Sequence, residues 1–149
     1  MEINIRKGES KDIQATYDLI KELAIYEKAG DKVVNTPEGM LKDGFGENPV
    51  FQLFVAENEG KVIGIALYFF SYSTWKGRCL YLDDLVVSEK LRGNGIGKML
   101  IEKLIEEAKA QNCAMVHWQV LDWNEPAIRF YKRLNANLDG EWVNCKVVI

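Results

Sequence analysis

The 149-residue sequence, with 48% hydrophobic and 28% charged residues, is long enough for one globular domain with a sizeable core. A net charge of −3 argues against nucleic acid as the main partner, since such proteins usually present a basic face. No apolar run reaches the ~20 residues that span a bilayer and no secretory signal is visible, so we expect a cytoplasmic protein without a membrane partner. The three cysteines have no zinc-site spacing, and no metal site is expected.

The first third of the chain predicts a strand and two helices. Residues 2–6 alternate polar and apolar side chains, as a half-buried strand does. Ser10 is the expected N-cap of a helix whose apolar residues recur at helical spacing, and Gly30 can end it. Thr36 and Pro37 are typical of the cap and first position of a second, short helix.

Strands and a glycine loop follow. Residues 51–58 and 62–72 read as a hairpin, and 79–88 reads as a strand interrupted by two acids. The glycine loop then leads into an amphipathic helix over about 97–111.

The last third predicts two more strands around one helix. Residues 114–121 form a strand, Asn124 caps a helix over 125–134, and 141–149 form a final strand. This order of elements predicts one α/β layer structure with a mixed sheet.

The loop "RGNGIG" places three glycines between a strand and a helix. A helix N-terminus carries unpaired N–H groups and partial positive charge, and glycines let an anion come close. The dinucleotide fingerprint fails because Lys98 stands where glycine is needed, and the P-loop pattern fails because Met99 follows Lys98. The spacing alone leaves two alternatives open, a phosphate site and a structural turn.

Asp83 and Asp84 interrupt a strand otherwise made of leucine, tyrosine and valine. Two acids are costly to bury there without a purpose, so they are the best candidates for a base. Alternation along a strand predicts that they point to opposite faces, and that only one of them faces a given cleft. The alternative is a strand-end acid bonded to nearby backbone.

The loop matches the Arg/Gln-x-x-Gly-x-Gly/Ala acetyl-CoA motif of the GNAT N-acetyltransferase superfamily. "IKELAIYEKAG", "YSTWKGRCLYLDDLVV", "VLDWNEPAIRFYKRLNA" and "EW" follow the order seen in diamine (spermidine/spermine-type) and thialysine N-acetyltransferases. The chain resembles these enzymes from about Ile3 to Trp142. The resemblance implies an α/β (α+β) GNAT fold in a single domain, 1–149. Its mixed, mostly antiparallel sheet has about six to seven strands, is splayed at the cofactor cleft and is flanked by about four helices.

The resemblance also implies the cofactor and the residues that hold it. Acetyl-CoA would bind in the splay and leave as CoA. Backbone groups of Leu85, Val86 and Val87 would hold the pantetheine arm, which Asn124 would also contact. The pyrophosphate would bind the amides of Arg92, Gly93, Asn94, Gly95, Ile96, Gly97 and Lys98.

Acetyl transfer to an amine needs a proton acceptor for the amine and a proton donor for the leaving thiolate. Tyr131 occupies the position of the family's tyrosine that faces the cofactor sulfur, and it is our candidate acid. A packed core tyrosine is the alternative for that residue. The family usually has glutamate at the position of Asp83, where the residue contacts the substrate amine, so Asp83 is our candidate base.

The acceptor pocket implied by the resemblance is acidic and aromatic, as a cationic chain with methylene groups would require. Glu141 is expected to reach across from a neighbouring subunit of a homodimer, and His117, a lone strand histidine, has a structural role as its alternative. The expected acceptor-binding residues are Tyr26, Glu27, Asp83, His117, Trp118, Gln119 and Glu141.

The sequence therefore predicts an acetyl-CoA-dependent N-acetyltransferase. It would act on a primary amine of a small cationic acceptor, a diamine, polyamine or thialysine/lysine-like molecule, by direct attack in a ternary complex. One alternative is a GNAT enzyme for another acceptor, such as an amino acid, an aminoglycoside or a protein N-terminus. The other is a non-catalytic sensor that binds acetyl-CoA.

Overall fold

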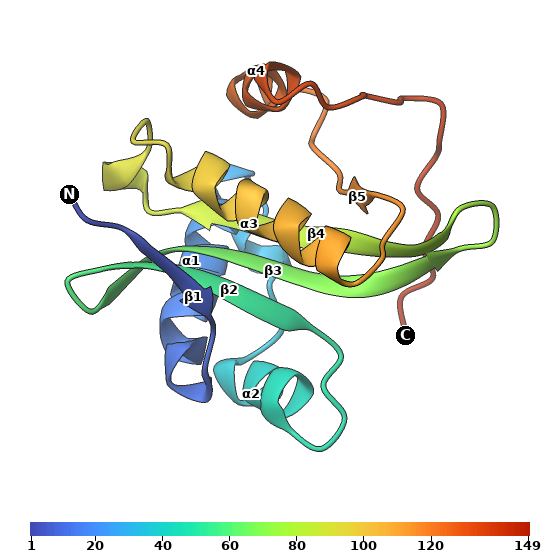
Figure 1. Cartoon of the computed structure of the whole chain (residues 1–149). Helices are drawn as coiled ribbons and strands as arrows, with labels where there is room; N and C mark the ends of the chain where they lie inside the picture. The colour runs from blue at the N-terminus through green and yellow to red at the C-terminus, as the bar shows by residue number, and fades with distance from the viewer. The chain divides into compact units, whose positions relative to one another are not determined.

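The computed structural model describes residues 1–149, which divide into two units, Met1–Trp118 and Gln119–Ile149. The first unit holds a five-stranded sheet in the order β1-β2-β3-β4-β5, antiparallel except for the parallel β4–β5 pair (Figure 1). Its strands are β1 (Asn4–Lys7), β2 (Gln52–Asn58), β3 (Lys61–Ser73), β4 (Gly77–Val87) and β5 (Val116–His117). That residues 1–149 form a single domain stays a prediction.

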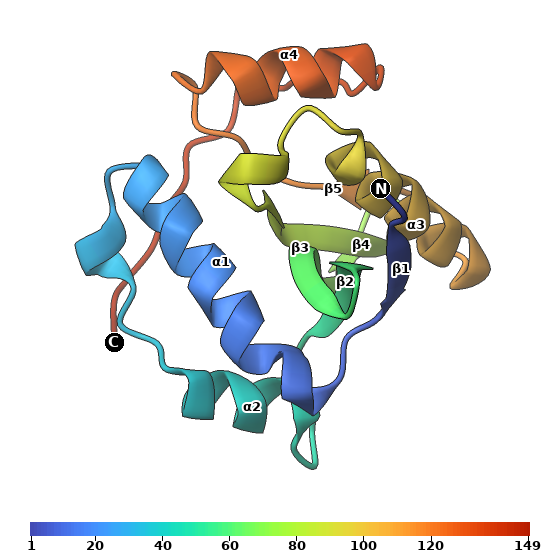
Figure 2. The same cartoon turned by 90° about the vertical axis from the view of Figure 1, so that its left-hand side faces the viewer.

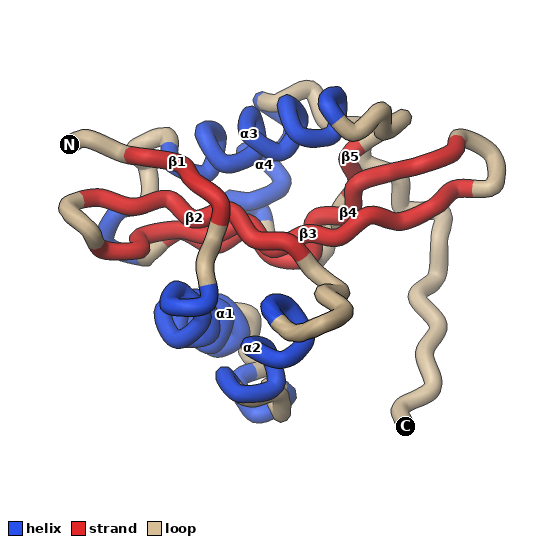
Figure 3. The backbone as a smooth tube through the Cα atoms, turned by 60° about the horizontal axis from the view of Figure 1, so that its bottom comes forward, coloured by secondary structure: helices blue, strands red, loops and turns tan.

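Helices cover both faces of this sheet. Helices α1 (Ile13–Tyr26) and α2 (Pro37–Phe45) lie on one face and α3 (Ile96–Ala110) on the other (Figures 2 and 3). The core accordingly has one apolar cluster on each side, one including Leu100 and Leu104 of α3 and the other Ile13 and Leu19 of α1. No helix of the structure combines the length and the apolarity that crossing a membrane requires.

The ends of α1 differ from the prediction. Ser10 lies inside a 3₁₀ turn, Ser10–Asp12, and is not the N-cap, because the Glu9 N–H donates to the Asp12 carboxylate at 2.7 Å and starts the turn one residue earlier. The helix ends at Tyr26, before Gly30, since Lys28 takes the left-handed conformation (φ 62°) that stops it. Because the helix stops here, Tyr26 is the last residue of α1 and Glu27 is its C-cap.

Strand β4 contains a β-bulge at the two acids. Leu82 pairs with Tyr68 and Asp84 pairs with Leu67, so Asp83 is an extra residue without a partner on β3. Regular alternation is therefore interrupted at the two acids, and that Asp83 and Asp84 point to opposite faces stays a prediction. The bulge shifts the phase of the strand, and Asp84 shares the α1 face with its partner Leu67.

The sheet opens along the edge of β4 that faces away from β3. β5 pairs only with Leu80 and Tyr81, and no strand continues along β4 beyond that point. This opening agrees with the predicted splay. The strand predicted over 114–121 is cut to two residues, because β5 stops where its pairing with β4 stops.

The second unit contains α4 (Glu125–Arg133), whose cap is the one predicted: the Asn124 side chain accepts from the Ala127 N–H at 3.4 Å. The strand predicted over 141–149 is absent, since this unit offers no second strand to satisfy its backbone groups. The sheet thus has five strands, fewer than the six to seven expected, while the four α-helices agree with the prediction.

Candidate active site

The glycine loop lies where a strand end meets a helix start. A short 3₁₀ turn, η3 (Glu89–Leu91), follows β4, and α3 begins at Ile96. Asn94 holds the bend, because its side-chain amide donates to the Leu91 carbonyl at 2.9 Å. The first N–H groups of α3, those of Ile96, Gly97 and Lys98, have no partner within the helix and form a donor surface with partial positive charge.

Two glycines of this loop need to be glycine. Gly93 (φ 85°) and Gly95 (φ 78°) adopt the left-handed conformation, and a Cβ added to either would meet no atom within 4 Å. The loop therefore forms a bare cradle that side chains would fill, and this geometry fits a diphosphate held by backbone amides. The Arg92 N–H, at the C-cap of η3, donates weakly to the Glu89 carbonyl at 3.4 Å, and its predicted contact with the pyrophosphate stays a prediction.

The acids of β4 form an electrostatic cluster with the end of α1. Burial, helped by the nearby Asp83 and Glu27 carboxylates, raises the pKa of Asp84 to about 7. Burial also raises the pKa of Glu27 and that of Asp83, although the Asp83 side chain remains accessible to solvent. Asp84 is consequently the acid whose charge changes near neutral pH, and it is the one the bulge turns toward α1.

Three rings, one each from β3, β4 and β5, form an aromatic group near the acids. Tyr81 packs edge-to-face on His117 with ring centroids 4.8 Å apart, and Phe69 lies 5.1 Å from Tyr81. The His117 Nε2 is 3.0 Å from the Ser71 hydroxyl, and burial lowers the pKa of His117, which favours the neutral ring. Burial, with the Asp83 and Asp84 charges, raises the pKa of Tyr81.

The structure separates the predicted site residues between the two units. The β4 backbone of residues 85–87 and the loop residues 92–98 lie in the first unit, with Tyr26, Glu27, Asp83, His117 and Trp118. Trp118 follows the last residue of β5, so its predicted place on the strand is wrong. Within this unit the acids, the end of α1 and the aromatic group come together.

Four predicted residues belong to the second unit, where each has a local role. Gln119 donates to the Asn144 side chain at 2.7 Å and does not lie on a strand. Asn124 caps α4, and Tyr131, on α4, packs beside Phe130. The Glu141 N–H donates to the Asp139 carboxylate at 3.0 Å. The second unit thus supplies a capped helix that carries the candidate acid.

Sequence reasoning missed Tyr81, a neighbour of the acids, and Phe69, which packs against Tyr81. Their periodicity carries no signal of function, because aromatic residues in strands usually serve packing. Only the strand register, with Phe69 opposite Tyr81 and Tyr81 beside His117, brings the three rings together.

Comparison with known proteins agrees with this geometry. A family model described as "Acetyltransferase (GNAT) family" matches residues 15–136. A thialysine N-epsilon-acetyltransferase of Bos taurus is 43% identical over 142 residues, covering 90% of this chain and 84% of that protein. An integron cassette protein from the mobile metagenome of V. cholerae superposes with a TM-score of 0.81 at 26% identity, over 99% of this chain and 93% of that one.

A more distant structure shares the fold alone. An aminoglycoside N-acetyltransferase solved in complex with CoA superposes with a TM-score of 0.80 at 16% identity, over 98% of this chain and 95% of that one. The open sheet, the glycine loop and the matched family model together define an acetyltransferase. The chain belongs to the GNAT family.

Proposed function

We propose that this protein uses acetyl-CoA to acetylate a primary amine of a small cationic acceptor, either thialysine/lysine-like or a diamine or polyamine. The observation that carries the proposal is the group of three carboxylates, Glu27, Asp83 and Asp84, gathered at the open edge of β4. Carboxylates attract a cationic acceptor, and the rings of Tyr81 and His117 suit its methylene groups. The name of the Bos taurus relative supports an amino-acid-like amine as the acceptor.

The cofactor would be held mainly by backbone. The cradle at Gly93 and Gly95 fits a diphosphate, and the amides of residues 93–98 are the proposed donors. Along β4, the backbone of Leu85, Val86 and Val87 has no strand partner on its open side and is the proposed contact for the pantetheine arm. Asn124 is proposed as a further pantetheine contact.

When bound, acetyl-CoA supplies a thioester carbonyl that a neutral amine can attack directly. An alkylammonium titrates near ~10, so a base must first remove a proton. Asp83 is proposed as that base, through water, and Asp84 as the neighbour that sets the charge around it. Converting an alkylammonium into an amide releases two protons. Asp83 would take the first before attack and pass it to solvent. Tyr131 is proposed to give a proton to the departing thiolate and to regain one, through water, from the nitrogen as the amide forms.

We also propose a homodimer. The segment 134–149 forms no helix or strand, and several of its apolar side chains are more than three-quarters exposed: Trp142, Val143, Val147, Val148 and Ile149. Apolar side chains gathered in this way favour an interface with a second copy, to which Glu141 would contribute.

A panel of amines tests the proposed function. Acetyl-CoA-dependent thiol release would be measured with thialysine, lysine, putrescine, spermidine, spermine, an aminoglycoside and a peptide. We expect turnover with at least one of the first five amines in this panel. The Glu27→Gln variant should bind that amine more weakly than the wild type does. Turnover confined to the peptide or the aminoglycoside would overturn the acceptor class. Tight CoA binding without any turnover would instead favour a sensor.

The pH dependence of kcat should report the acid cluster. The raised pKa of Asp84, about 7, leaves about half of that carboxyl protonated near pH 7. When Asp84 ionises, its negative charge makes the neighbouring Asp83, the proposed base, a stronger proton acceptor. We therefore expect kcat to rise with pH through about 7 and to level off above it. Asp84→Asn should remove this inflection, because it removes the carboxyl whose pKa is about 7. An unchanged inflection in Asp84→Asn, measured at saturating acetyl-CoA and amine, would contradict the assignment.

A further inference from the structure

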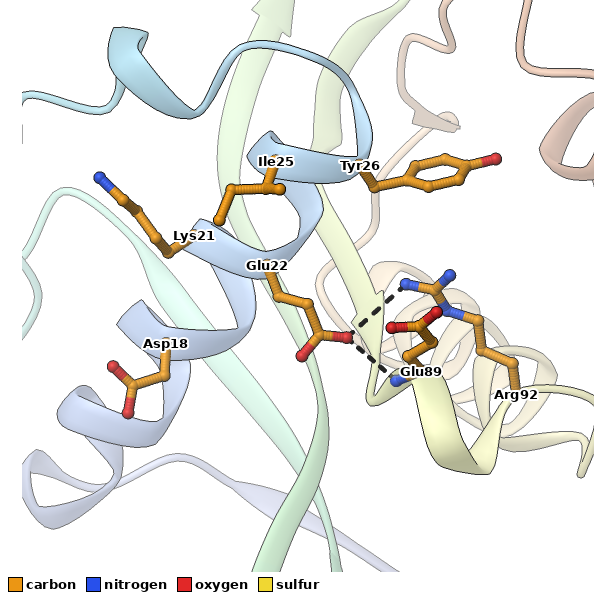
Figure 4. Close-up of a pocket in the computed structure, with 7 residues that line it drawn as sticks. All are labelled: Asp18, Lys21, Glu22, Ile25, Tyr26, Glu89 and Arg92. Carbon is orange, nitrogen blue, oxygen red and sulfur yellow. Dashed lines mark hydrogen bonds and ion pairs between the residues drawn. The ribbon is translucent and has the colours of Figure 1, made fainter.

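A surface pocket lies between α1 and the turn that leads into the glycine loop. Figure 4 shows the side chains of α1 on one side and those of η3 and the loop on the other. One α1 carboxylate reaches across to the loop side, as the dashed lines mark. The residues that line the pocket are Asp18, Lys21, Glu22, Ile25, Tyr26, Glu89 and Arg92.

The carboxylate that crosses the pocket is that of Glu22. Its Oε1 accepts a hydrogen bond from the Glu89 N–H at 3.0 Å, and the same oxygen lies 3.8 Å from the Arg92 Nη2. Glu89 is the first residue of η3, where the N–H has no partner within the turn. Glu22 thus caps η3 from a helix 67 residues away in the sequence.

The side chain of Arg92, the first residue of the loop, also contacts Val87 and Tyr26. Its Nε donates to the Val87 carbonyl at 3.3 Å, at the end of β4. Its guanidinium lies 5.5 Å from the centre of the Tyr26 ring, at the end of α1. The side chain therefore ties α1, the end of β4 and the loop together.

These contacts are too exposed to matter much for global stability. The Arg92 and Glu22 side chains are 41% and 37% exposed, and ion pairs of that kind contribute little to folding. Their effect is local, because Gly93 and Gly95 follow at once and glycines lose the most freedom when ordered. A loop that is ordered before a ligand arrives binds it at a lower entropic cost.

We propose that Glu22 is a positioning residue for the cofactor loop. By capping η3 and holding Arg92, it fixes the start of the loop so that the amides of residues 93–98 are ordered for the diphosphate. The inference rests on the proposed function in one respect only, the identity of the bound anion. Its effect on the order of the loop is independent of any ligand.

Two variants of Glu22 and one matched control test the inference. Glu22→Ala removes both contacts, whereas Glu22→Gln keeps an oxygen for the Glu89 N–H and loses the charge that faces Arg92. Asp18→Asn is the control, since Asp18 lines the same pocket and its oxygen accepts only from Gln14, at 3.0 Å, within α1. The readouts are amide hydrogen exchange of residues 88–98 without ligand, and the Kd for CoA by calorimetry.

In Glu22→Ala we expect faster exchange over residues 88–98 and a Kd for CoA raised about three- to tenfold, the worth of one ordinary hydrogen bond. Glu22→Gln should fall between Glu22→Ala and wild type, and Asp18→Asn should match wild type. At saturating acetyl-CoA and amine, kcat of Glu22→Ala should stay within about twofold of wild type, because a positioning residue does not touch the reacting atoms.

Unchanged exchange in Glu22→Ala, or an equal change in Asp18→Asn, would overturn the inference whatever the wild type binds. Faster exchange with an unchanged Kd would also overturn it, because the ordered loop would then not serve binding. Failure of the wild type to bind CoA is a different result. It would overturn the proposed function, while the exchange data would still decide whether Glu22 orders the loop.

Discussion

Replacing Tyr131 by phenylalanine should lower kcat by about a hundred- to a thousandfold, the usual effect of losing a general acid. The KM values for acetyl-CoA and amine should change little, because only the phenolic hydroxyl is lost. Steady-state kinetics would measure kcat at saturating acetyl-CoA and amine, and variation of each substrate in turn would measure the two KM values.

A second tyrosine provides the control for Tyr131. Tyr17 on α1 is partly buried and packs against the apolar cluster on that face of the sheet, so Tyr17→Phe removes a hydroxyl outside the proposed site. We expect Tyr17→Phe to keep kcat within about twofold of wild type, as substitutions without a catalytic contact usually do. If Tyr131→Phe retains full kcat as well, the tyrosine is a packing residue and the proton must come from elsewhere.

Replacing Gly95 by alanine should weaken CoA binding by about ten- to a hundredfold, the worth of one hydrogen bond to a charged group. The left-handed conformation of Gly95 (φ 78°) is strained for alanine, and the new methyl group would enter the open cradle. Both effects disturb the donors at the start of α3. Calorimetric titration with CoA measures the change.

Gly60→Ala is a closely matched control. Gly60 has nearly the same conformation (φ 75°), and an added Cβ there also meets nothing within 4 Å, but it lies in the turn between β2 and β3. Each variant should lose about 1–2 kcal/mol of stability from the backbone strain. Only Gly95→Ala should lose affinity for CoA. Equal affinities in the two variants would show that the loop does not hold the cofactor.

Local signals in the sequence were sufficient to predict most elements and the loop. The spacing of Leu100 and Leu104 predicted the buried face of α3, and both side chains are fully buried. Asn124 and Thr36 were recognised as caps, because a cap depends on residues within three positions. Gly93 and Gly95 stood out for the same reason, since a positive φ is a property of the residue itself.

Features that depend on distant partners could not be predicted. The bulge at Asp83 exists because β3 and β4 pair in a shifted register, which no local pattern in β4 reveals. The segment 141–149 is rich in β-branched and apolar residues, as strands are, but a strand forms only where another offers its edge. No local pattern marks Glu22, because its bond to Glu89 depends on how α1 packs on the sheet.

The bulge at Asp83 has a consequence for how enzymes of this kind diversify. Because Asp83 has no partner across β3, its side chain can be exchanged without breaking a pair in the ladder. The residues after it, Leu85 to Val87, keep their own register with β3 whatever stands at position 83. Under the proposed function, selection for a new acceptor can therefore act on one unpaired position while the strand proposed to hold the cofactor stays as it is.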